Sequence, residues 1–513
     1  MAIPMRSKKS KITKKTVNKE NSIFDSSKIL AFSLLAVLII FIWSSSTSIL
    51  SDTTVRICAT SRKFNLFCEI PLPVINVIQK ESHFPPSASQ SAPSNNKEMV
   101  NARKEVERQV SVLRSYIAKS KALNALNCDG RGIYVYDLPT KFNKDLLAKC
   151  KEITWLDFCK YLSNDGIGEP LLELGNGWYN THQYSLEPIF HSRVLNHPCR
   201  VKTAEEANLF YVPFYGGLDV LRWHFKNVSN DLKDALSHEL VDWLKSQSSW
   251  RRNFGLDHVL VLGKITWDFR RSGNGTWGTG LLGLDGLDRV FKLLIERHPW
   301  EINEVGVPHP THFHPRSDKE ILDLQAQLRR THRVNFISFA GASRNSSESI
   351  RSRIIDQCTS TPDKCTFLDC ENQACFSPVP VIKLFMKSEF CLQPAGDSPT
   401  RKSLFDSLVA GCIPVLFNPL TAYYQYAWHL PEDYRKYSVY IDQDDIRSSK
   451  VNVVEVLVKI PLKEREKMRK YIIFELMPRL VYADPRAKLE IFEDAFSIAM
   501  NNLLERSRIS RLH

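Results

Sequence analysis

The chain has 513 residues, which is too long for one ordinary domain and long enough for two sizeable hydrophobic cores. Its composition is that of a globular protein, with 43% hydrophobic, 10% aromatic and 24% charged residues. The net charge of +13 is unevenly placed, because residues 1–28 hold eight Lys or Arg and two acids, which leaves only +7 for the rest. No zinc-ligand spacing and no basic helical face accompany this charge, so we expect no nucleic-acid partner.

Residues 29–51 contain no charged side chain and begin with a nearly continuous apolar run. A helix of about 20 uncharged residues is long enough to cross a bilayer. The long basic segment before the run, and the lack of a small-x-small cleavage site after it, favour an uncleaved signal anchor over a cleaved signal peptide. Because positive residues stay on the cytosolic side, we expect a cytosolic basic tail at 1–28, a transmembrane helix at 29–51 and a lumenal remainder.

Two observations agree with this type II orientation. All twelve Cys follow the apolar span, where disulfides can form. The three Asn-x-Ser/Thr glycosylation sequons, at Asn227, Asn274 and Asn345, follow it as well.

Residues 52–127 are expected to form a stem, since 85–96 are rich in Ser, Pro and Asn and are unsuited to packing in a core. Within this region Val106, Val110, Leu113 and Ile117 recur at helical spacing. Two alternatives stay open for that helix: a short coiled coil that pairs two stems, or docking on the globular part.

Globular sequence begins near Cys128 and alternates short apolar runs with helical patterns. The runs predict strands at 132–136, 208–213, 258–262, 334–339, 389–392 and 412–417. The helical patterns lie at 231–245, 288–297, 402–410, 462–482 and 486–506. The sequence therefore predicts an α/β fold with two doubly wound domains: an N-terminal domain at 128–330, a C-terminal domain at 331–482 and a last helix at 483–513.

The stretch from Phe390 to Val415 is the most informative: it predicts a strand, a Gly-containing polar loop, a helix, a turn at Gly411 and a second strand. Asp397, Ser398 or Thr400 is expected to cap the helix, whose free amides and positive end suit a diphosphate. Arg401 would add a charge-assisted contact, and Asp406 lies further along the same helix. The alternative is an ordinary capped helix with an Arg in solvent.

This stretch resembles the signature of the exostosin-like glycosyltransferases, in which Ser/Thr-x-Arg is followed by an acidic residue and Gly-Cys-Ile-Pro-Val. Further stretches match in the same order across about 128–480, with the plant xyloglucan galactosyltransferases as the most similar branch. They are Gly-Ile-Tyr-Val-Tyr-Asp-Leu-Pro from 132, Phe-Tyr-Val-Pro-Phe-Tyr from 210, Thr-Trp-Asp-Phe-Arg-Arg from 266, Pro-His-Pro-Thr-His-Phe-His-Pro from 308 and Trp-His-Leu-Pro from 428. Asp406 departs from the pattern, since many members have Glu there.

The resemblance implies a two-domain glycosyltransferase B fold, a donor bound by the C-terminal domain, and inversion at the transferred sugar carbon. It implies a donor site formed by Arg344, Ser398, Arg401 and Asp406, with Asp406 on the ribose. An inverting transfer needs a base, and we expect it in the N-terminal domain. Asp268 is the first candidate, and His182 and Asp219 are its rivals. Trp178, Trp223 and Trp277 are candidates for an acceptor groove, although core packing is the alternative for each.

Three further clusters are assigned no metal. Asp442-Gln-Asp-Asp445 is interpreted as a solvated acidic turn, and His309, His312 and His314 as linker histidines without carboxylate partners at ligand spacing. The spacing of Cys358, Cys365, Cys370 and Cys375 fits no common zinc site, which favours local disulfides, and the three connectivities stay open.

Taken with the anchor, the resemblance implies a Golgi membrane glycosyltransferase that moves galactose from UDP-galactose to xylose side chains of xyloglucan, with no cofactor or metal. The alternatives are a galacturonosyl donor, or another matrix polysaccharide such as mannan. A catalytically silent glycan-binding or Golgi complex partner is the alternative of a different class. A homodimer, or a complex with other wall-synthesis transferases, is left open.

Overall fold

The computed structural model of the chain describes residues 58–60, 66–68, 96–117, 128, 130–153, 156–271, 275–343, 349–371 and 375–511. The chain divides into two units, Met1–Asn76 and Val77–His513. In the first unit the antiparallel strands β1 (Cys58–Thr60) and β2 (Leu66–Cys68) pair with each other. No helix within the described ranges is long and apolar enough to span a bilayer, and the predicted anchor lies outside those ranges.

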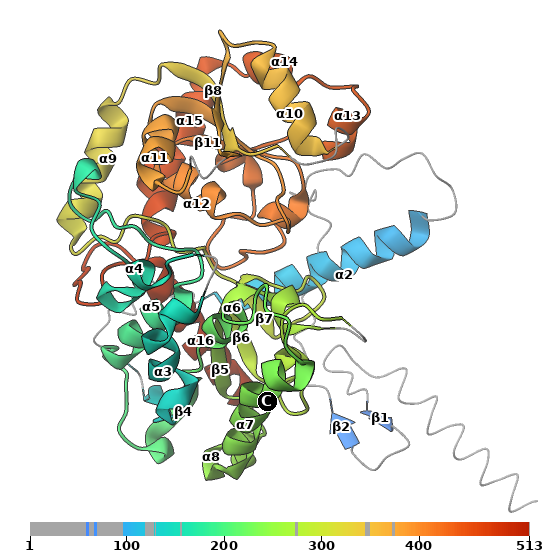
Figure 1. The fold of residues 1–513 in the computed structure, drawn as a ribbon, viewed down its shortest axis with the longest axis vertical. Helices are drawn as coiled ribbons and strands as arrows, with labels where there is room; N and C mark the ends of the chain where they lie inside the picture. Colours follow the sequence, from blue (N-terminus) through green and yellow to red (C-terminus); the bar gives the residue numbers. More distant parts are fainter. Residues whose placement is uncertain are drawn as a thin grey trace, which may run out of the picture. The chain divides into compact units, whose positions relative to one another are not determined.

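The second unit is built on two five-stranded parallel sheets, each of which is the centre of one lobe (Figure 1). In the first lobe the sheet order follows the chain order without a reversal. Its strands are β3 (Gly132–Val135), β4 (Ala207–Val212), β5 (His258–Ile265), β6 (Phe291–Glu296) and β7 (Glu304–Gly306). The central strands are buried on both faces, which explains why they are nearly continuous apolar runs in the sequence.

Helices cover both faces of this first sheet. Along β5, Val259 and Val261 join one core while Leu260 and Leu262 join the other, as the two-residue period of a strand requires. The core containing Val259 includes residues of α2 (Asn96–Ser115), α5 (Leu186–Leu195) and α16 (Ala495–Arg511). The opposite core includes residues of α3 (Lys144–Ala148), α6 (Gly216–Leu221), α7 (Asn230–Ser246) and α8 (Ser248–Asn253).

The sheet of the second lobe reverses its strand order. Its strands are β8 (Asn335–Gly341), β9 (Cys365–Asp369), β10 (Ser388–Gln393), β11 (Ile413–Leu416) and β12 (Val439–Tyr440), and the spatial order is β9-β8-β10-β11-β12. Its helices are α9 (Asp318–Arg330), α10 (Ile350–Thr359), α11 (Pro378–Met386), α12 (Lys402–Val409), α13 (Gln443–Arg447), α14 (Val453–Val458) and α15 (Leu462–Tyr471). The order reverses between β8 and β10, which is the switch point where open α/β sheets bind ligands.

Two helical predictions were wrong. The segment 288–297 contains the strand β6, because a strand buried on both faces shows a mixed apolar pattern that periodicity does not distinguish from a helix. In the tail, the final helix begins only at Ala495, and 486–494 form no helix. The predicted strands at 208–213, 258–262 and 389–392 are confirmed in position as β4, β5 and β10.

The helix α2 packs on both lobes, which decides between the two alternatives left open for it. Val106, Val110 and Leu113 are buried in the core of the first lobe. The Leu113 carbonyl accepts a hydrogen bond at 2.8 Å from Nε1 of Trp428, which belongs to the chain segment after β11. The helix therefore docks on the globular unit.

Five disulfides lie within the described residues: Cys128–Cys199, Cys150–Cys159, Cys358–Cys365, Cys370–Cys375 and Cys391–Cys412. The prediction of local pairing among the four cysteines at 358–375 is confirmed, with the first joined to the second and the third joined to the fourth. The Cys391–Cys412 bridge ties β10 to the turn before β11 and so closes the segment that contains α12.

A single buried guanidinium holds the junction of α2 and the two lobes together. Arg297 is fully buried at the end of β6 and donates to Gln109 Oε1 of α2 at 3.0 Å. It also donates to the carbonyls of Tyr424 at 3.1 Å and of Glu304 at 2.9 Å. Its acceptors come from both lobes and from α2, so one side chain links three parts of the chain.

Replacing Arg297 by Met should lower the free energy of unfolding by about 3 kcal/mol or more, because several buried acceptors lose their donor together. Urea denaturation of the purified protein measures this change. Arg251→Met, at an exposed position of α8, is the matched control and should be nearly neutral. Equal stability of the two variants would show that the junction does not depend on this guanidinium.

Candidate functional site

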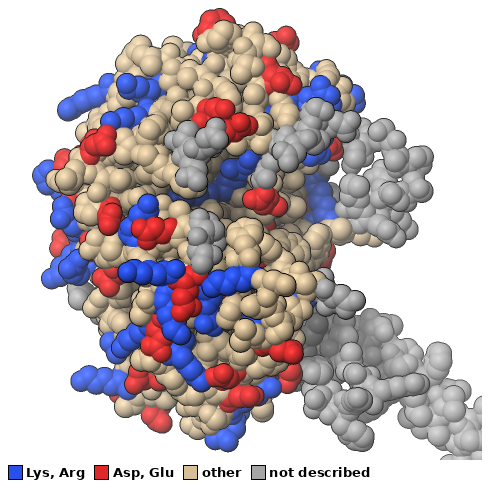
Figure 2. All heavy atoms as spheres, viewed as in Figure 1, with Lys and Arg blue, Asp and Glu red and all other residues tan. Residues whose placement is uncertain are grey.

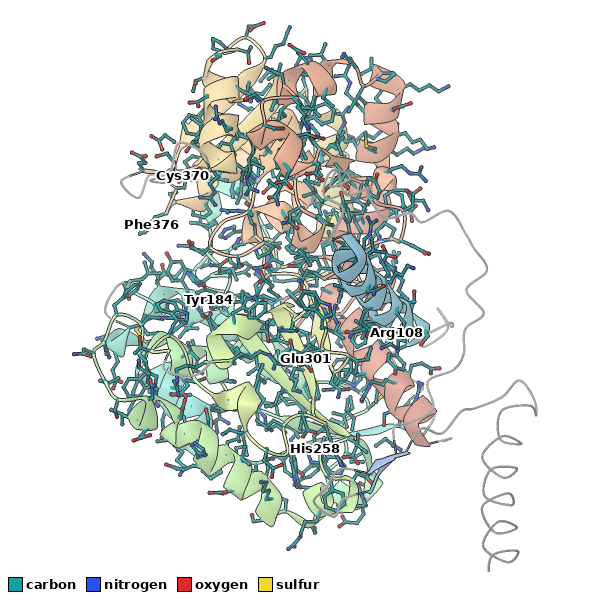
Figure 3. The ribbon with its side chains drawn as sticks, turned by 90° about the vertical axis from the view of Figure 1, so that its right-hand side faces the viewer. Arg108, Tyr184, His258, Glu301, Cys370 and Phe376 are labelled. Carbon is teal, nitrogen blue, oxygen red and sulfur yellow. A yellow bond between two sulfur atoms is a disulfide. The ribbon has the colours of Figure 1, made fainter. Side chains whose placement is uncertain are left out.

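A cavity of about 570 Å³ lies where the carboxyl ends of both sheets meet. The first lobe contributes residues around His182, Ile265 and Ile295, and the second contributes the segments after β8 and β10. Figure 2 shows the hollow between the lobes, with Lys and Arg atoms on its wall. In Figure 3, Phe376 and Cys370 of the second lobe lie across this gap from Tyr184 of the first.

Two arginines converge on a glycine at the switch point. Gly396 lies in the loop 394–401 between β10 and α12, and a Cβ atom there would collide with the guanidinium of Arg401. The same Cβ would lie 3.1 Å from Nη2 of Arg351, a residue of α10 whose Nε donates to the Ala395 carbonyl at 3.0 Å. Only glycine leaves room for two guanidinium groups this close to the loop backbone.

Arg401 carries a charge that no described carboxylate balances. Within the described ranges its one hydrogen bond goes to Ser403 Oγ, at 3.4 Å. The side chain lines the cavity at the N-terminus of α12, where it occupies the N-cap position without making a capping bond. A cation in this position suits an anionic ligand that accepts charge-assisted hydrogen bonds.

Ser398 and Thr400 are not helix caps, so that prediction was wrong. The helix begins at Lys402, and both residues instead bind Glu296 of the first lobe. Oε2 of Glu296 accepts from Ser398 Oγ at 2.6 Å, from Thr400 N at 3.0 Å and from Thr400 Oγ1 at 2.5 Å. Its Oε1 accepts from Trp267 Nε1 at 3.1 Å. A buried carboxylate of one lobe thus holds the cavity loop of the other.

Asp406 lines the cavity, but its carboxylate is already paired. Lys402 Nζ, one helical turn earlier, lies 2.9 and 2.8 Å from its two oxygens. His312 Nε2 lies 4.0 Å from Asp406 Oδ2. Burial raises the pKa of Asp406 and lowers the pKa of Lys402, so desolvation partly offsets the attraction between the two.

His182 is the one candidate base that the structure brings to the cavity wall. Its ring lies among the rings of Phe158, Tyr161 and Tyr184, at centroid distances of 4.6, 5.2 and 5.0 Å. Burial, reinforced by Lys402, lowers its pKa to about 3, so the imidazole is neutral. Its Nδ1 accepts the Tyr184 N–H at 3.2 Å, which places the remaining proton on Nε2 and makes that atom a donor.

The predicted linker histidines are buried, and His309 and His312 also line the cavity, a role that was not predicted for them. The segment crosses between the lobes through the cleft, and its histidines are buried there. His312 Nδ1 lies 3.0 Å from the Tyr179 carbonyl and 3.2 Å from the Thr181 amide nitrogen, so it donates to the carbonyl in one tautomer and accepts the amide N–H in the other. In the tautomer that donates to Tyr179, the lone pair is on Nε2, which lies 4.0 Å from Asp406 Oδ2 and is able to accept a proton.

The structure does not bring Asp268 or Asp219 to the cavity wall. Asp268 is 3% exposed, pairs with Lys264 Nζ at 2.9 Å and accepts from Trp277 Nε1 at 2.6 Å. Asp219 pairs with Arg222 at 2.5 Å, and burial raises its pKa to about 6. Both carboxylates are buried in ion pairs and are not among the residues that line the cavity.

The remaining predicted residues divide into those the structure describes and those it does not. Arg344, Asn274 and Asn345 lie outside the described residues. Asn227 is exposed in the loop before α7, as an acceptor of a glycan must be. Trp178 is buried against Phe313, and none of Trp178, Trp223 and Trp277 lines the cavity.

No group of three metal-ligating side chains gathers anywhere in the described part of the chain. Asp442 of the acidic turn caps α13, since its side chain accepts from the Asp444 N–H at 2.9 Å. Asp444 in turn pairs with Arg447 at 3.0 Å.

Comparison with known proteins assigns the chain to a family. The Exostosin GT47 domain matches residues 127–457, and the chain belongs to this glycosyltransferase family. It is 58% identical over 382 residues to the xyloglucan-specific galacturonosyltransferase 1 of Arabidopsis thaliana, covering 74% of this chain and 58% of that protein. It is 55% identical over 382 residues to the probable xyloglucan galactosyltransferase GT20 of the same plant, covering 74% of this chain and 68% of that protein.

A third relative, the xyloglucan galactosyltransferase MUR3 of Arabidopsis thaliana, is 43% identical over 397 residues, which cover 75% of this chain and 63% of that protein. The match thus spans about three fifths of the length of these relatives. Among solved structures, the pneumococcal O-GlcNAc transferase GtfA in complex with UDP and GlcNAc aligns with 52% of this chain and 60% of its own. With a TM-score of 0.24 and 10% identity, that likeness carries no argument.

Four cavity or loop residues were missed by the sequence reasoning: Glu296, Arg351, His312 and Lys402. Lys402 had a local signal, since it stands four residues before an acid on a helix. For His312 the signal was that its stretch, 308–315, resembles the family, whereas its residue type and spacing did not indicate a functional role. Glu296 and Arg351 act on a loop about 100 and 44 residues away in sequence, and no local pattern reveals such contacts.

Replacing Glu296 by Gln should loosen the 394–401 loop, because a neutral amide loses the charge-assisted bonds to Ser398 and Thr400. We expect the Thr400 amide to exchange with solvent about tenfold faster or more, which corresponds to ~1.4 kcal/mol. Hydrogen exchange measured by mass spectrometry checks this. Glu301→Gln, in the same lobe and without a contact to the loop, should leave the exchange rate unchanged, and equal rates in both variants would contradict the proposed hold.

The buried histidines make stability depend on pH. Burial lowers the pKa of seven histidines to about 3 or 4, namely His182, His191, His197, His224, His309, His314 and His429, and it lowers the pKa of His312 well below 6.5. In the unfolded chain they titrate near 6.5, so below that pH only the unfolded state binds these protons. Each buried histidine then lowers the free energy of unfolding by up to about 1.4 kcal/mol for each pH unit below 6.5.

Two buried carboxyls act in the opposite direction, because burial raises the pKa of Glu187 to about 8 and of Asp219 to about 6. The folded state binds their protons first and gains stability as the pH falls. The histidines outnumber them, so the thermal midpoint should fall by several degrees between pH 7 and pH 5. Calorimetry across this range measures the change, and a constant or rising midpoint would show that the histidines are not buried in the neutral form.

Proposed function

We propose that the protein is an inverting glycosyltransferase of the glycosyltransferase B type that moves galactose from UDP-galactose to xylose side chains of xyloglucan. The observation that carries the proposal is the convergence of Arg401 and Arg351 on Gly396 at the switch point of the second lobe. Three relatives named as xyloglucan transferases support the choice of acceptor, and the two of them that are named galactosyltransferases support the choice of sugar.

The two arginines suit a nucleotide diphosphate. A diphosphate needs several donors in a fixed arrangement, which guanidinium groups and the amides at the start of α12 supply. In this proposal Arg401 and Arg351 bind the phosphate oxygens of UDP, and Ser398 positions the loop through its bond to Glu296. Arg344 joins them in the proposed donor site. Asp406 binds the ribose only if its bond to Lys402 rearranges.

Transfer is a single displacement. The acceptor hydroxyl oxygen forms a bond to the anomeric carbon while the bond from that carbon to the β-phosphate oxygen breaks, and UDP leaves with the electron pair. Arg401 and Arg351 stabilise the charge that develops on the leaving phosphate. No metal is needed in this scheme, because the guanidinium groups supply the positive charge.

The acceptor proton needs a base at the cavity. Of the candidates His182, Asp268 and Asp219, only His182 lines it, and its Nε2 hydrogen makes it a donor toward a sugar or phosphate oxygen. We assign proton acceptance to Nε2 of His312, in the tautomer whose other nitrogen donates to Tyr179. Bound UDP brings negative charge into the cavity, which raises the pKa of a nearby histidine toward the range that base catalysis requires.

A galacturonosyl donor is the alternative, and the relative at 58% identity carries that name. A uronic acid places an additional carboxylate in the site, which needs another cation. Lys402 is the remaining basic residue among those that line the cavity, and Asp406 already neutralises it. While the Lys402–Asp406 pair stays intact, the cavity therefore favours a neutral hexose.

The proposal places the enzyme in the Golgi membrane as a single-pass type II protein with a lumenal catalytic part. The uncharged segment at 29–51, the sequons and the five disulfides support an oxidising lumenal compartment. A homodimer, or a complex with other wall-synthesis transferases, belongs to the same proposal.

Arg401→Ala should weaken UDP binding by about tenfold to a hundredfold and lower transfer by at least as much, since a charge-assisted bond contributes about 1.5–3 kcal/mol. Calorimetric titration with UDP, and UDP release from UDP-galactose in the presence of xylosylated glucan, measure the two effects. Arg447→Ala, on the surface of α13, is the control. A folded variant with unchanged UDP affinity would contradict the assignment of the donor site to Arg401. A folded wild-type protein that turns over no UDP-sugar would favour the alternative of a non-catalytic glycan-binding or complex partner.

A further inference from the structure

Three aromatic rings form an exposed row on the first lobe, here called the aromatic strip: Trp267, His298 and Trp300. The indoles of Trp267 and Trp300 are 44% and 46% exposed. The His298 ring stands between them, with centroids 4.9 Å from Trp267 and 5.7 Å from Trp300. Large aromatic surfaces left in solvent side by side mark a binding surface more often than isolated exposed residues do.

The strip lies at the same edge of the sheet as the cavity. Trp267 follows β5, and His298 and Trp300 follow β6, so all three stand just after the carboxyl ends of adjacent parallel strands. Ile265 and Ile295, two and three residues before them, line the cavity itself. In Figure 3, Glu301, the neighbour of Trp300, lies nearer to the cleft than His258, which begins β5.

A hydrogen-bonded path joins the strip to the cavity loop. Trp267 Nε1 donates to Oε1 of Glu296 at 3.1 Å, and Oε2 of the same carboxylate holds Ser398 of the cavity wall. The first ring of the strip is therefore one side chain away from the donor loop. A ligand on the strip would extend directly into the site of transfer.

The backbone under the strip is held in place. His298 N donates to Glu304 Oε2 at 2.7 Å, and the Trp300 carbonyl accepts from Gln109 Nε2 of α2 at 2.9 Å. Arg270, beside the strip, pairs with the buried Glu304 at 2.5 Å. A preorganised surface loses little entropy when a ligand binds.

We propose that the aromatic strip binds the β-glucan backbone of the acceptor while a side-chain sugar enters the cavity. This inference rests on the proposed function and names the surface that selects its polymeric substrate. A pyranose presents an apolar C–H face that stacks on an aromatic ring and hydroxyls around its edge that need polar partners. Arg270 and Glu301, at the border of the strip and 3.7 Å apart, are placed to bond those hydroxyls.

A linear glucan fits this surface better than a protein partner does. A protein interface has a desolvated apolar centre inside a polar rim, whereas this strip is a single row one ring wide with charged groups beside it. Its continuity with the cavity matches a chain whose branch is the acceptor. The surface thus adds affinity that grows with the length of the acceptor.

Trp300→Ala in the full-length protein is the cleaner test, because Trp267 also bonds Glu296. We expect this variant to bind long xyloglucan oligosaccharides about tenfold more weakly than the wild type and the shortest ones equally well, with unchanged UDP affinity. Trp267→Phe, which keeps a ring and removes the N–H, should retain most of the length dependence. Phe254→Ala, an exposed aromatic before β5 at the opposite edge of the sheet, is the matched control.

Calorimetric titration with oligosaccharides of increasing length, without donor, measures the effect, and KM against length in the transfer assay repeats it. An unchanged length dependence in Trp300→Ala would overturn the inference while leaving the proposed transfer intact. A change of oligomeric state without loss of glucan binding would overturn it too, since the strip would then be a protein interface. Loss of transfer with every UDP-sugar, in a wild-type protein that still binds glucan through the strip, would remove the proposed function and keep the inference.

Discussion

Two consecutive charged residues at the end of β6 determine how the lobes of this protein meet. Glu296 extends its carboxylate to the loop before α12, and Arg297 extends its guanidinium to α2 and to the segment after β11. Both side chains are at most 1% exposed. Burying such charges is costly unless every polar atom finds a partner, so a displacement of either lobe would leave charged atoms without their bonds. The width of the cavity therefore follows from this one strand end.

The same constraint shapes the electrostatics of the cavity. The histidines of its wall are neutral because they are buried, and Lys402 and Asp406 balance each other. Arg401, whose charge no described carboxylate balances, and Arg351 both line the cavity close to Gly396. The convergence of two guanidinium groups at one place favours an anionic group of the ligand there, because each can donate charge-assisted hydrogen bonds.

The sequence predicted the parts of this arrangement that are local. The strand, loop and helix around Gly396 follow from a short segment whose residue types carry the whole pattern, and Arg401 was placed correctly on the cavity wall. The wrong assignment of Ser398 involves a distant partner. Ser398 was taken for a cap because its true acceptor, Glu296, is 102 residues away. Asp268 was the first candidate base, and its carboxylate is paired with Lys264 and accepts a hydrogen bond from Trp277 away from the cavity lining. The strand β6 was missed for a related reason: its pattern reflects burial on two faces, which depends on what packs there.

The difference between local and distant contacts affects which parts of the protein would determine donor specificity and which would determine acceptor specificity. The donor loop lies in one stretch of the second lobe, so it is recognisable across a family that transfers different sugars. The aromatic strip is assembled from the ends of two strands in the first lobe, and Trp178 shows that an equally conspicuous Trp can instead be buried against Phe313. Only the fold separates the two cases. Under the proposed roles, a change of acceptor would act on strand ends of the first lobe, whereas a change of donor would act on a loop that the other lobe holds through Glu296.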